Sequence, residues 1–439
     1  MASETVSDFT NNNYSLAKEK YKTWGIDTDE VIKTLSNYKI SLPCWQTDDV
    51  TGLERASSLE GSGLQSTGSY PGKARNWEEI KSDLDKVLSL IPGTHRINVH
   101  AIYRSNGGSR IDRDQISVSH FSEWIEWAEE KKIGIDFNGS FFAHPNASDG
   151  NTLTHHDEKI RKFWINHGLR CREIGEAIGK RLGSRCITNI WIPDGSKDTC
   201  VDRYTPRKRL IESLDQILST VHDGTFLADA VESKLFGIGS ESFVAGSHEF
   251  YLLYASRAAK TPQLSGVPLR PEMLLCLDTG HFHPTEQISD KISSLLAFLP
   301  GVLLHISRGV RWDSDHVPVL NDELSSIARD IRTACAFEKI NIALDFFDAS
   351  INRIAALVVG ARSFQKAMCM ALLEPIEAIR ETKKNVSNTS RLVLQEEFKN
   401  LPWNAVWEKF CLNYNVPTGR SLMESITQYE VDVLNKRRS

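Results

Sequence analysis

Eight short runs rich in β-branched and apolar residues alternate strictly with helix-period segments along this chain of 439 residues. Such alternation predicts a parallel sheet, because each return to a parallel strand needs a crossover connection. Eight repeats favour closure into a (β/α)8 TIM barrel, in which the carboxyl ends of the strands meet on one face and carry the active site. The expected strands are residues 39–45, 96–103, 133–138, 187–194, 226–234, 274–281, 302–307 and 340–347.

Seven helix-like segments separate these strands, among them residues 77–91, 121–131, 158–182, 207–221, 286–299 and 322–337. About 90 residues follow the eighth strand, more than one closing helix needs. We expect that helix at 351–373, and a helical extension made of 376–401, 403–413 and 421–436. The chain is therefore divided into an α/β barrel catalytic domain at residues 1–375, including the N-terminal segment, and a helical extension at 376–439 that we expect to serve oligomerisation.

Two long polar connections interrupt the repeat. Residues 47–75 follow the first strand, and loops of this length are usually functional lids or disordered. Residues 257–271 contain three prolines and are predicted to be a surface insert, to which we assign no chemistry.

The composition limits the classes of partner. The net charge is −5, and no basic run is longer than the three residues of Lys436, Arg437 and Arg438, which argues against nucleic acid and anionic membranes and favours a small ligand. The eight cysteines are scattered without a CxxC pair, as expected in a reducing compartment. The N-terminus lacks the apolar core of a signal peptide, and we see no apolar stretch approaching the roughly 18 residues of a membrane span. We predict a cytoplasmic protein.

Four metal-capable residues end or follow four consecutive strands: Glu232, Asp278, His305 and Asp345. A barrel brings such residues together although they are far apart in sequence. Carboxylate oxygen combined with imidazole favours Mn, Co or Zn over Ca. The alternative is a hydrogen-bonded carboxylate network without metal, but buried carboxylates are costly unless they are paired or metallated.

A second group of possible ligands lies just outside the strands: His281 in DTGHFHP, and Asp313 with Asp315 in RWDSDH. Two carboxylates at i and i+2 can hold one cation from an extended loop, so we predict two divalent cations per subunit, with solvated or turn-capping acids as the alternative. His283 and His316 are interpreted as structural or supporting residues.

Lys234 follows Glu232 by two residues, so strand alternation places both on the barrel interior. His100 ends the second strand and is the best free acid or base, because histidine titrates near neutrality. Trp45, Trp191 and Phe141 could form an apolar wall for a sugar ring, although each could equally be ordinary core.

Long motifs spread over nearly the whole chain resemble the L-rhamnose isomerase family, within the xylose isomerase-like barrels. They include CWQTDDVTG, STGSYPGKARN, DGNTLTHHD, NIWIPDGSKD, DAVESKLFGIGSES, LDTGHFHPTEQISDKIS, RWDSDHV, LDFFDASINRIAA and LPWNAVWE. The resemblance implies a structural metal at Glu232, Asp278, His305 and Asp345 and a catalytic metal at His281, Asp313 and Asp315. It also implies roles for Lys234 and His100, Mn²⁺ as the usual cofactor, with Co²⁺ or Zn²⁺ as alternatives at the structural site, and a homotetramer.

The predicted activity is interconversion of L-rhamnose and L-rhamnulose, in which divalent metal assists a shift of hydride between C1 and C2. Lys234, His100 and Asp313 are the expected catalytic residues, and Trp191, Trp45 and His281 are expected to contact the sugar. The residues alone also permit proton transfer through an enediol. Two other classes remain open: a two-metal hydrolase, and a sugar-binding barrel without catalysis.

Overall fold

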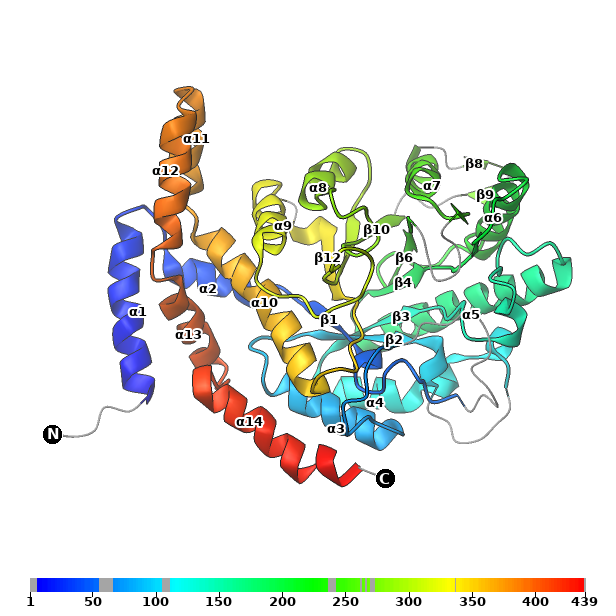
Figure 1. Cartoon of the computed structure of the whole chain (residues 1–439), viewed down its shortest axis with the longest axis horizontal. Coiled ribbons are helices and arrows are strands. Elements are labelled where there is room, and N and C mark those ends of the chain that lie inside the picture. The colour runs from blue at the N-terminus through cyan, green and yellow to red at the C-terminus, as the bar shows by residue number, and fades with distance from the viewer. Residues whose placement is uncertain are drawn as a thin grey trace.

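Eight parallel strands form the centre of the molecule, and Figure 1 shows the helices arranged around them. The structure, a computed structural model, describes residues 6–54, 66–104, 111–235, 242–260, 263–264, 267–268, 273–335 and 337–437. The hydrogen-bonded order is β3-β2-β1-β12-β11-β10-β6-β4. These strands are β1 (Ile40–Pro43), β2 (Arg96–His100), β3 (Gly134–Asn138), β4 (Cys186–Ile190), β6 (Leu227–Glu232), β10 (Leu274–Asp278), β11 (Val302–Ile306) and β12 (Ile340–Leu344).

Side chains join the two strands at the ends of this order. β3 and β4 lie next to each other. The Asp136 carboxylate of β3 accepts a hydrogen bond of 2.9 Å from the backbone N–H of Ile187 in β4. Arg96 of β2 donates to Asp136 at 2.8 Å and to the carbonyl of Arg185 at 2.8 Å. The nearly closed ring of eight strands confirms the predicted TIM barrel.

One α-helix follows each barrel strand. The eight are α3 (Trp77–Leu88), α4 (Ser122–Lys131), α5 (Glu158–Leu182), α6 (Tyr204–Ile217), α7 (His248–Lys260), α8 (Ser289–Leu296), α9 (Asp322–Thr333) and α10 (Arg353–Leu373). The longest, α5, begins after Asp157, whose side chain accepts from the N–H of Lys159, and ends at Gly183, whose φ of 58° suits a residue without a side chain.

The two predicted connections are partly described. Residues 257–260, expected to begin the surface insert, are instead the last turn of α7. Two short pairs of antiparallel strands lie outside the barrel sheet: β5 (Gly195–Ser196) with β7 (Phe243–Val244), and β8 (Gln263–Leu264) with β9 (Val267–Pro268). The rest of the insert, and residues 55–65 of the long loop after β1, lie outside the described residues.

The helical extension differs from its prediction in one element. The single helix expected over 376–401 is wrong: α11 (Ile376–Lys384) and α12 (Asn388–Lys399) form a hairpin, and Val386 in their turn has a φ of 52°. This hairpin projects from the rest of the molecule (Figure 1). α13 (Trp403–Asn413) and α14 (Gly419–Asp432) follow, and α14 meets α3 through a 2.8 Å hydrogen bond from Tyr429 to Asp83.

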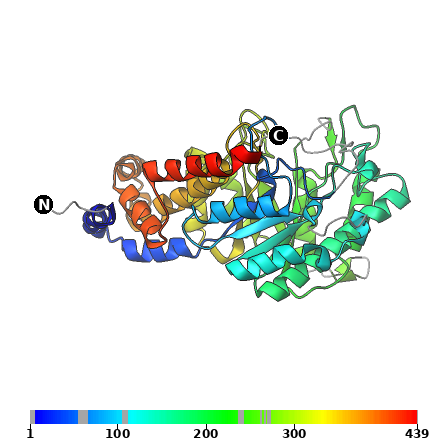
Figure 2. The ribbon, with the colours of Figure 1, turned by 90° about the horizontal axis from the view of Figure 1, so that it is seen from below.

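Two N-terminal helices join this extension. α1 (Val6–Lys22) packs on α13, and α2 (Thr28–Ser36) packs on α10 and α13. Figure 2 shows α1, α2 and the C-terminal helices before α14 gathered at one end of the molecule, while α14, in red, runs from that end towards the middle. The division at residue 375 stays a prediction.

One helix was misjudged by its composition. α10 is 21 residues long, and within the described chain it is the one helix with the length and hydropathy of a membrane span, contrary to the sequence expectation. Most of that window, 83%, is buried inside the protein, as in the core helix of a globular domain.

Strand alternation explains what the barrel encloses. Ala228 and Ala230 of β6, Cys276 of β10 and Leu303 of β11 belong to one small buried cluster, with Ile187, Leu274 and Ala343. Asp229, at the opposite parity of β6, is bound by Arg172 of α5. The even-numbered residues of β6 therefore point into the barrel, and the next even-numbered residue of that strand is Glu232.

Candidate active site

The four predicted strand-end ligands lie together above the buried cluster. Glu232, Asp278, His305 and Asp345 each offer a ligand atom, and these atoms lie within 4.8 Å of one another. Each of the four follows an inward-pointing residue of the buried cluster by two positions, so its side chain points inward as well. The preceding residues are Ala230, Cys276, Leu303 and Ala343. The Nδ1 of His305 lies 3.2 Å from Glu232 Oε2 and 2.9 Å from Asp345 Oδ2. Four strands have thus converged on one point, as predicted.

The donor set fits a divalent cation. Asp278 Oδ2 and His305 Nε2 are buried and lack a hydrogen-bond partner in the described part of the chain. Buried polar atoms are nearly always satisfied, so those that are not call for an explanation such as an ion. Three carboxylates with one imidazole match the ligand chemistry of Mn, Co or Zn.

The pKa values of the carboxyl groups in this set reflect their burial and the charges beside them. Burial, with the nearby carboxylates of Glu232 and Asp345 opposing His281, raises the pKa of Asp278 to about 7. Burial alone would raise the pKa of Glu232 as well, but His305 and His281 outweigh it and hold that pKa well below its ordinary value. A cation would relieve the repulsion between these carboxylates.

Two residues of the second predicted group, His281 and Asp313, come together at the mouth of β10. The Nε2 of His281 lies 3.6 Å from Asp313 Oδ2. The other ring nitrogen, Nδ1, lies 3.0 Å from the carbonyl of Ser233, which can only accept, so Nδ1 carries a proton and Nε2 is the nitrogen that could bind a cation in place of its own proton. Burial, with Asp313 and Asp278, raises the pKa of Asp315 well above its ordinary value.

Lys234 connects this group to the pocket wall. Its Nζ lies 3.1 Å from Asp313 Oδ2 and 4.9 Å from the centre of the Trp191 ring. Burial lowers the pKa of Lys234, but Asp313 and Asp315 outweigh it, so the pKa is raised and the side chain keeps its positive charge. Nearby carboxylates and an aromatic face both favour a cation at this position.

An aromatic pocket lies beside these charged groups. Trp45 packs edge-on against His100 at 4.8 Å between ring centres, and Phe142 lies between His100 at 5.5 Å and Trp191 at 6.0 Å. The lining residues are Trp45, Val50, His100, Asn138, Gly139, Phe142, Asn189, Trp191, Glu232, Lys234, His281, His305, Asp315, Asp345 and Phe347. Burial lowers the pKa of His100 to about 4, so its imidazole is neutral near pH 7.

The structure differs from the sequence prediction at two pocket positions. Phe141 does not line this pocket: it packs on Trp164 and His167, and its neighbour Phe142 takes the expected place. Asn189 was missed, although its Nδ2 donates to Glu232 Oε2. Its signal was a polar residue inside the apolar strand of NIWIP, at a position that alternation turns inward.

The two spare histidines lie apart from the ligand group. His283 is exposed and its Nδ1 lies 2.7 Å from Thr285 Oγ1, while His316 Nδ1 lies 3.0 Å from Ser314 Oγ. These local contacts agree with the structural role predicted for both.

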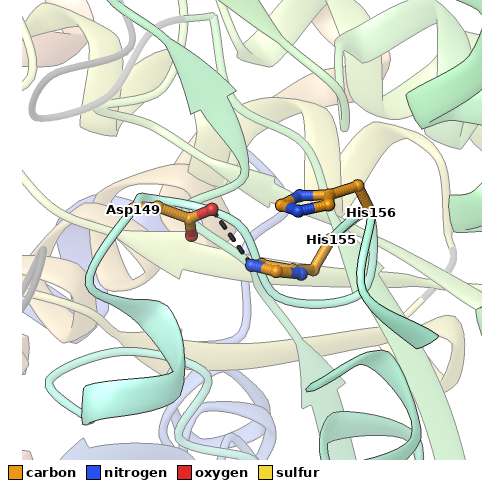
Figure 3. Close-up of side chains that lie close together, drawn as sticks. All are labelled: Asp149, His155 and His156. Carbon is orange, nitrogen blue, oxygen red and sulfur yellow. Dashed lines mark ion pairs between the residues drawn. The ribbon is translucent and has the colours of Figure 1, made fainter. Parts of the chain in front are cut away.

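A third group with metal-ligating side chains lies between β3 and α5. Asp149, His155 and His156 come close together, and Figure 3 shows the His156 ring stacked on the His155 ring, which Asp149 contacts. His155 Nε2 lies 3.1 Å from Asp149 Oδ2, and His155 Nδ1 accepts a 2.9 Å hydrogen bond from the N–H of Asp157. Since Nδ1 accepts, Nε2 carries the proton, so both nitrogens are occupied and this group orients the start of α5.

Comparison with known proteins agrees with this geometry. The family model described as L-rhamnose isomerase (RhaA) matches residues 9–437. The L-rhamnose isomerase of Rhodopirellula baltica is 50% identical over 424 residues, covering 97% of this chain and 96% of that protein. That of Salmonella agona is 48% identical, covering 97% and 98%. A solved structure of an L-ribulose 3-epimerase is a distant likeness, with 10% identity, a TM-score of 0.48 and coverage of 80% of this chain and 98% of that one. The chain therefore belongs to the L-rhamnose isomerase family, a family of aldose–ketose isomerases.

Proposed function

We propose that this protein interconverts L-rhamnose and L-rhamnulose at the pocket between Trp45 and Lys234, using two divalent cations, with Mn²⁺ as the physiological metal. The observation that carries the proposal is the convergence of Glu232, Asp278, His305 and Asp345 within 4.8 Å. Full-length similarity to L-rhamnose isomerases supports the choice of sugar.

The chain offers two sets of ligands. Glu232, Asp278, His305 and Asp345 would hold one cation rigidly, because they lie on or directly after barrel strands. His281, Asp313 and Asp315 would hold the other less rigidly, because both aspartates lie in the loop after β11. When bound, such cations act as Lewis acids on the sugar oxygens and lower the pKa of a substrate hydroxyl.

The reaction moves one hydride and one proton. In the direction from aldose to ketose, hydride moves from C2 to C1 while the O2 proton is transferred to O1, and negative charge develops on these oxygens. Lys234 is placed to stabilise that charge, because its ammonium group is buried beside Asp313 and faces the pocket.

His100 is the group proposed to assist ring opening of the sugar. Opening requires a base for the O1 hydroxyl proton and an acid for the ring oxygen, and a neutral imidazole can serve as the base. With a pKa of about 4, His100 is available in that form at pH 7. Trp45, Phe142 and Trp191 would provide an apolar wall that excludes water from the sugar.

The reaction and its mechanism can be tested together. The protein should form ketose from L-rhamnose, and the same assay with other aldoses gives its range. In D₂O, a hydride shift leaves C1 of the product free of solvent deuterium by NMR. Deuterium at that carbon would establish an enediol route and refute the hydride shift.

We also propose a cytoplasmic homotetramer in which the α11–α12 hairpin contributes to a subunit interface. These two helices contain no buried residue in the single chain. Leu392 and Val393 of α12 are each 56% exposed, and exposed apolar side chains on a projecting element favour an interaction surface.

A further inference from the structure

A strained turn borders the pocket directly after β1. Asp49 and Val50 have φ values of 54° and 59°, in the left-handed region of backbone conformation. L-amino acids other than glycine rarely adopt this region, and for a β-branched residue such as valine it is an outlier. Two such residues in succession indicate that surrounding contacts hold the turn in place.

The turn places Val50 in the pocket wall. Its N–H donates a 3.0 Å hydrogen bond to the carbonyl of Trp45, so the chain folds back on itself between two pocket-lining residues. Val50 is only 6% exposed. A relaxed backbone at this position would move an apolar side chain away from the sugar-binding space.

A buried guanidinium holds the turn from outside. Arg353, at the start of α10, donates from Nε and Nη2 to the two carboxylate oxygens of Asp49, each at 2.7 Å. Its Nη1 donates to the carbonyls of Tyr70 at 2.9 Å and Pro71 at 3.1 Å. Arg353 therefore fixes the chain on both sides of residues 55–65 with one side chain.

The neighbouring carboxylate holds the turn from the other side. Asp48 accepts from the Tyr103 hydroxyl at 2.6 Å and from the N–H of Gly52 at 2.8 Å. The N–H of Leu53 donates to the carbonyl of Ile102 at 2.9 Å. The contacts of Asp48 and Asp49 lie on different elements, so a shift of the turn must break one set or the other.

We propose that Arg353 and Asp49 are positioning residues for sugar binding, which hold Val50 in its left-handed conformation and so set the shape of the pocket. The inference rests on the proposed isomerase activity only for its assay. We call the ion pair between Arg353 and Asp49 the clamp. The clamp touches neither metal-ligand group, so its loss should affect sugar binding and leave metal content unchanged. Val50 would contact substrate and transition state alike, and loss of such uniform binding raises KM more than it lowers kcat.

The test compares Arg353→Lys with Arg172→Lys. Arg172 makes the same fork, from Nε and Nη2 to Asp229 at 2.8 and 3.0 Å and from Nη1 to a backbone carbonyl, but on the outside of the barrel. Lysine keeps the charge and cannot form the fork. Both variants should lose thermal stability, but only Arg353→Lys should raise KM for L-rhamnose, by about tenfold, which corresponds to about 1.4 kcal/mol. Equal KM values for both variants and wild type would overturn the proposal.

A second pair of variants separates the clamp from general damage. Asparagine tolerates the left-handed region and keeps one acceptor for Arg353, whereas alanine does neither. Asp49→Asn should keep KM within about threefold of wild type, and Asp49→Ala should raise it about tenfold, with metal content unchanged in both. If Asp49→Ala binds the sugar as well as Asp49→Asn does, or if either loses metal, the assignment is wrong. An inactive but folded wild-type protein would instead refute the proposed function.

Discussion

Replacing Glu232 with glutamine should remove the rigidly held cation while leaving the shape of the site intact. The Glu232 carboxylate is 3% exposed and meets His281 Nδ1 at 3.0 Å and His305 Nδ1 at 3.2 Å. Removing one partner from a buried charged group costs about 3–5 kcal/mol. We expect the lost contact between the carboxylate and the cation to be of this size. Since about 1.4 kcal/mol corresponds to a tenfold change, the affinity for Mn²⁺ should fall by about two to four orders of magnitude.

Asp229→Asn is the matched control for this change. Asp229 lies on the same strand, is 4% exposed, and faces Arg172 instead of the ligand group. Both variants should unfold at lower temperature, but only Glu232→Gln should lose metal. Calorimetric titration of metal-stripped protein with Mn²⁺ measures affinity and stoichiometry. Wild-type affinity in Glu232→Gln, or an equal loss in Asp229→Asn, would refute the assigned site.

Three further predictions concern the loop, pH and assembly. Asp313→Asn should retain one cation per subunit by elemental analysis, while turnover falls at least a hundredfold. A hundredfold loss of rate corresponds to a rise of only about 2.7 kcal/mol in the activation free energy. Normal turnover with full metal content would contradict the proposed role of Asp313. Burial lowers the pKa of His281, but Asp278 and Asp313 outweigh it and raise that pKa from 6.5 to about 10. Protonated His281 therefore stabilises the metal-free protein fully below pH 6.5, and this stabilisation is lost as the pH rises towards 10. Mn²⁺ must displace the proton in order to bind His281. Affinity should accordingly rise about tenfold per pH unit from 7 to 9, and a flat profile by calorimetry would contradict the proton displacement. Leu392→Glu with Val393→Glu should give smaller species in sedimentation, whereas Val201→Glu, at a fully exposed position away from the hairpin, should not; an unchanged oligomer would exclude α12 from the interface.

The barrel and its four strand-end ligands could be predicted because both depend on a local rule. Alternating side chains along a strand place Glu232, Asp278, His305 and Asp345 at the inward parity, and parallel strands bring their carboxyl ends together. The roles of these residues in binding metal and sugar stay predictions.

Other features depend on contacts that the sequence does not reveal. The position of Phe142 in the pocket instead of Phe141 is decided by how the chain leaves β3 and by the packing of Phe141 on Trp164. The break between α11 and α12 is set by Ser387, whose side chain accepts from the N–H of Ser390 at the start of α12, and by a positive φ at Val386, which valine rarely adopts. The left-handed backbone at Val50 is held by contacts from distant parts of the chain, among them the hydrogen bond from Arg353, about 300 residues later, to Asp49.

The proposed role of the two cations is tested most directly by the formation of ketose from L-rhamnose by metal-stripped protein as Mn²⁺ is added back. No detectable turnover is expected after exhaustive chelation, and recovery should be complete at two cations per subunit. Turnover that persists at the wild-type rate without metal would contradict the proposed role.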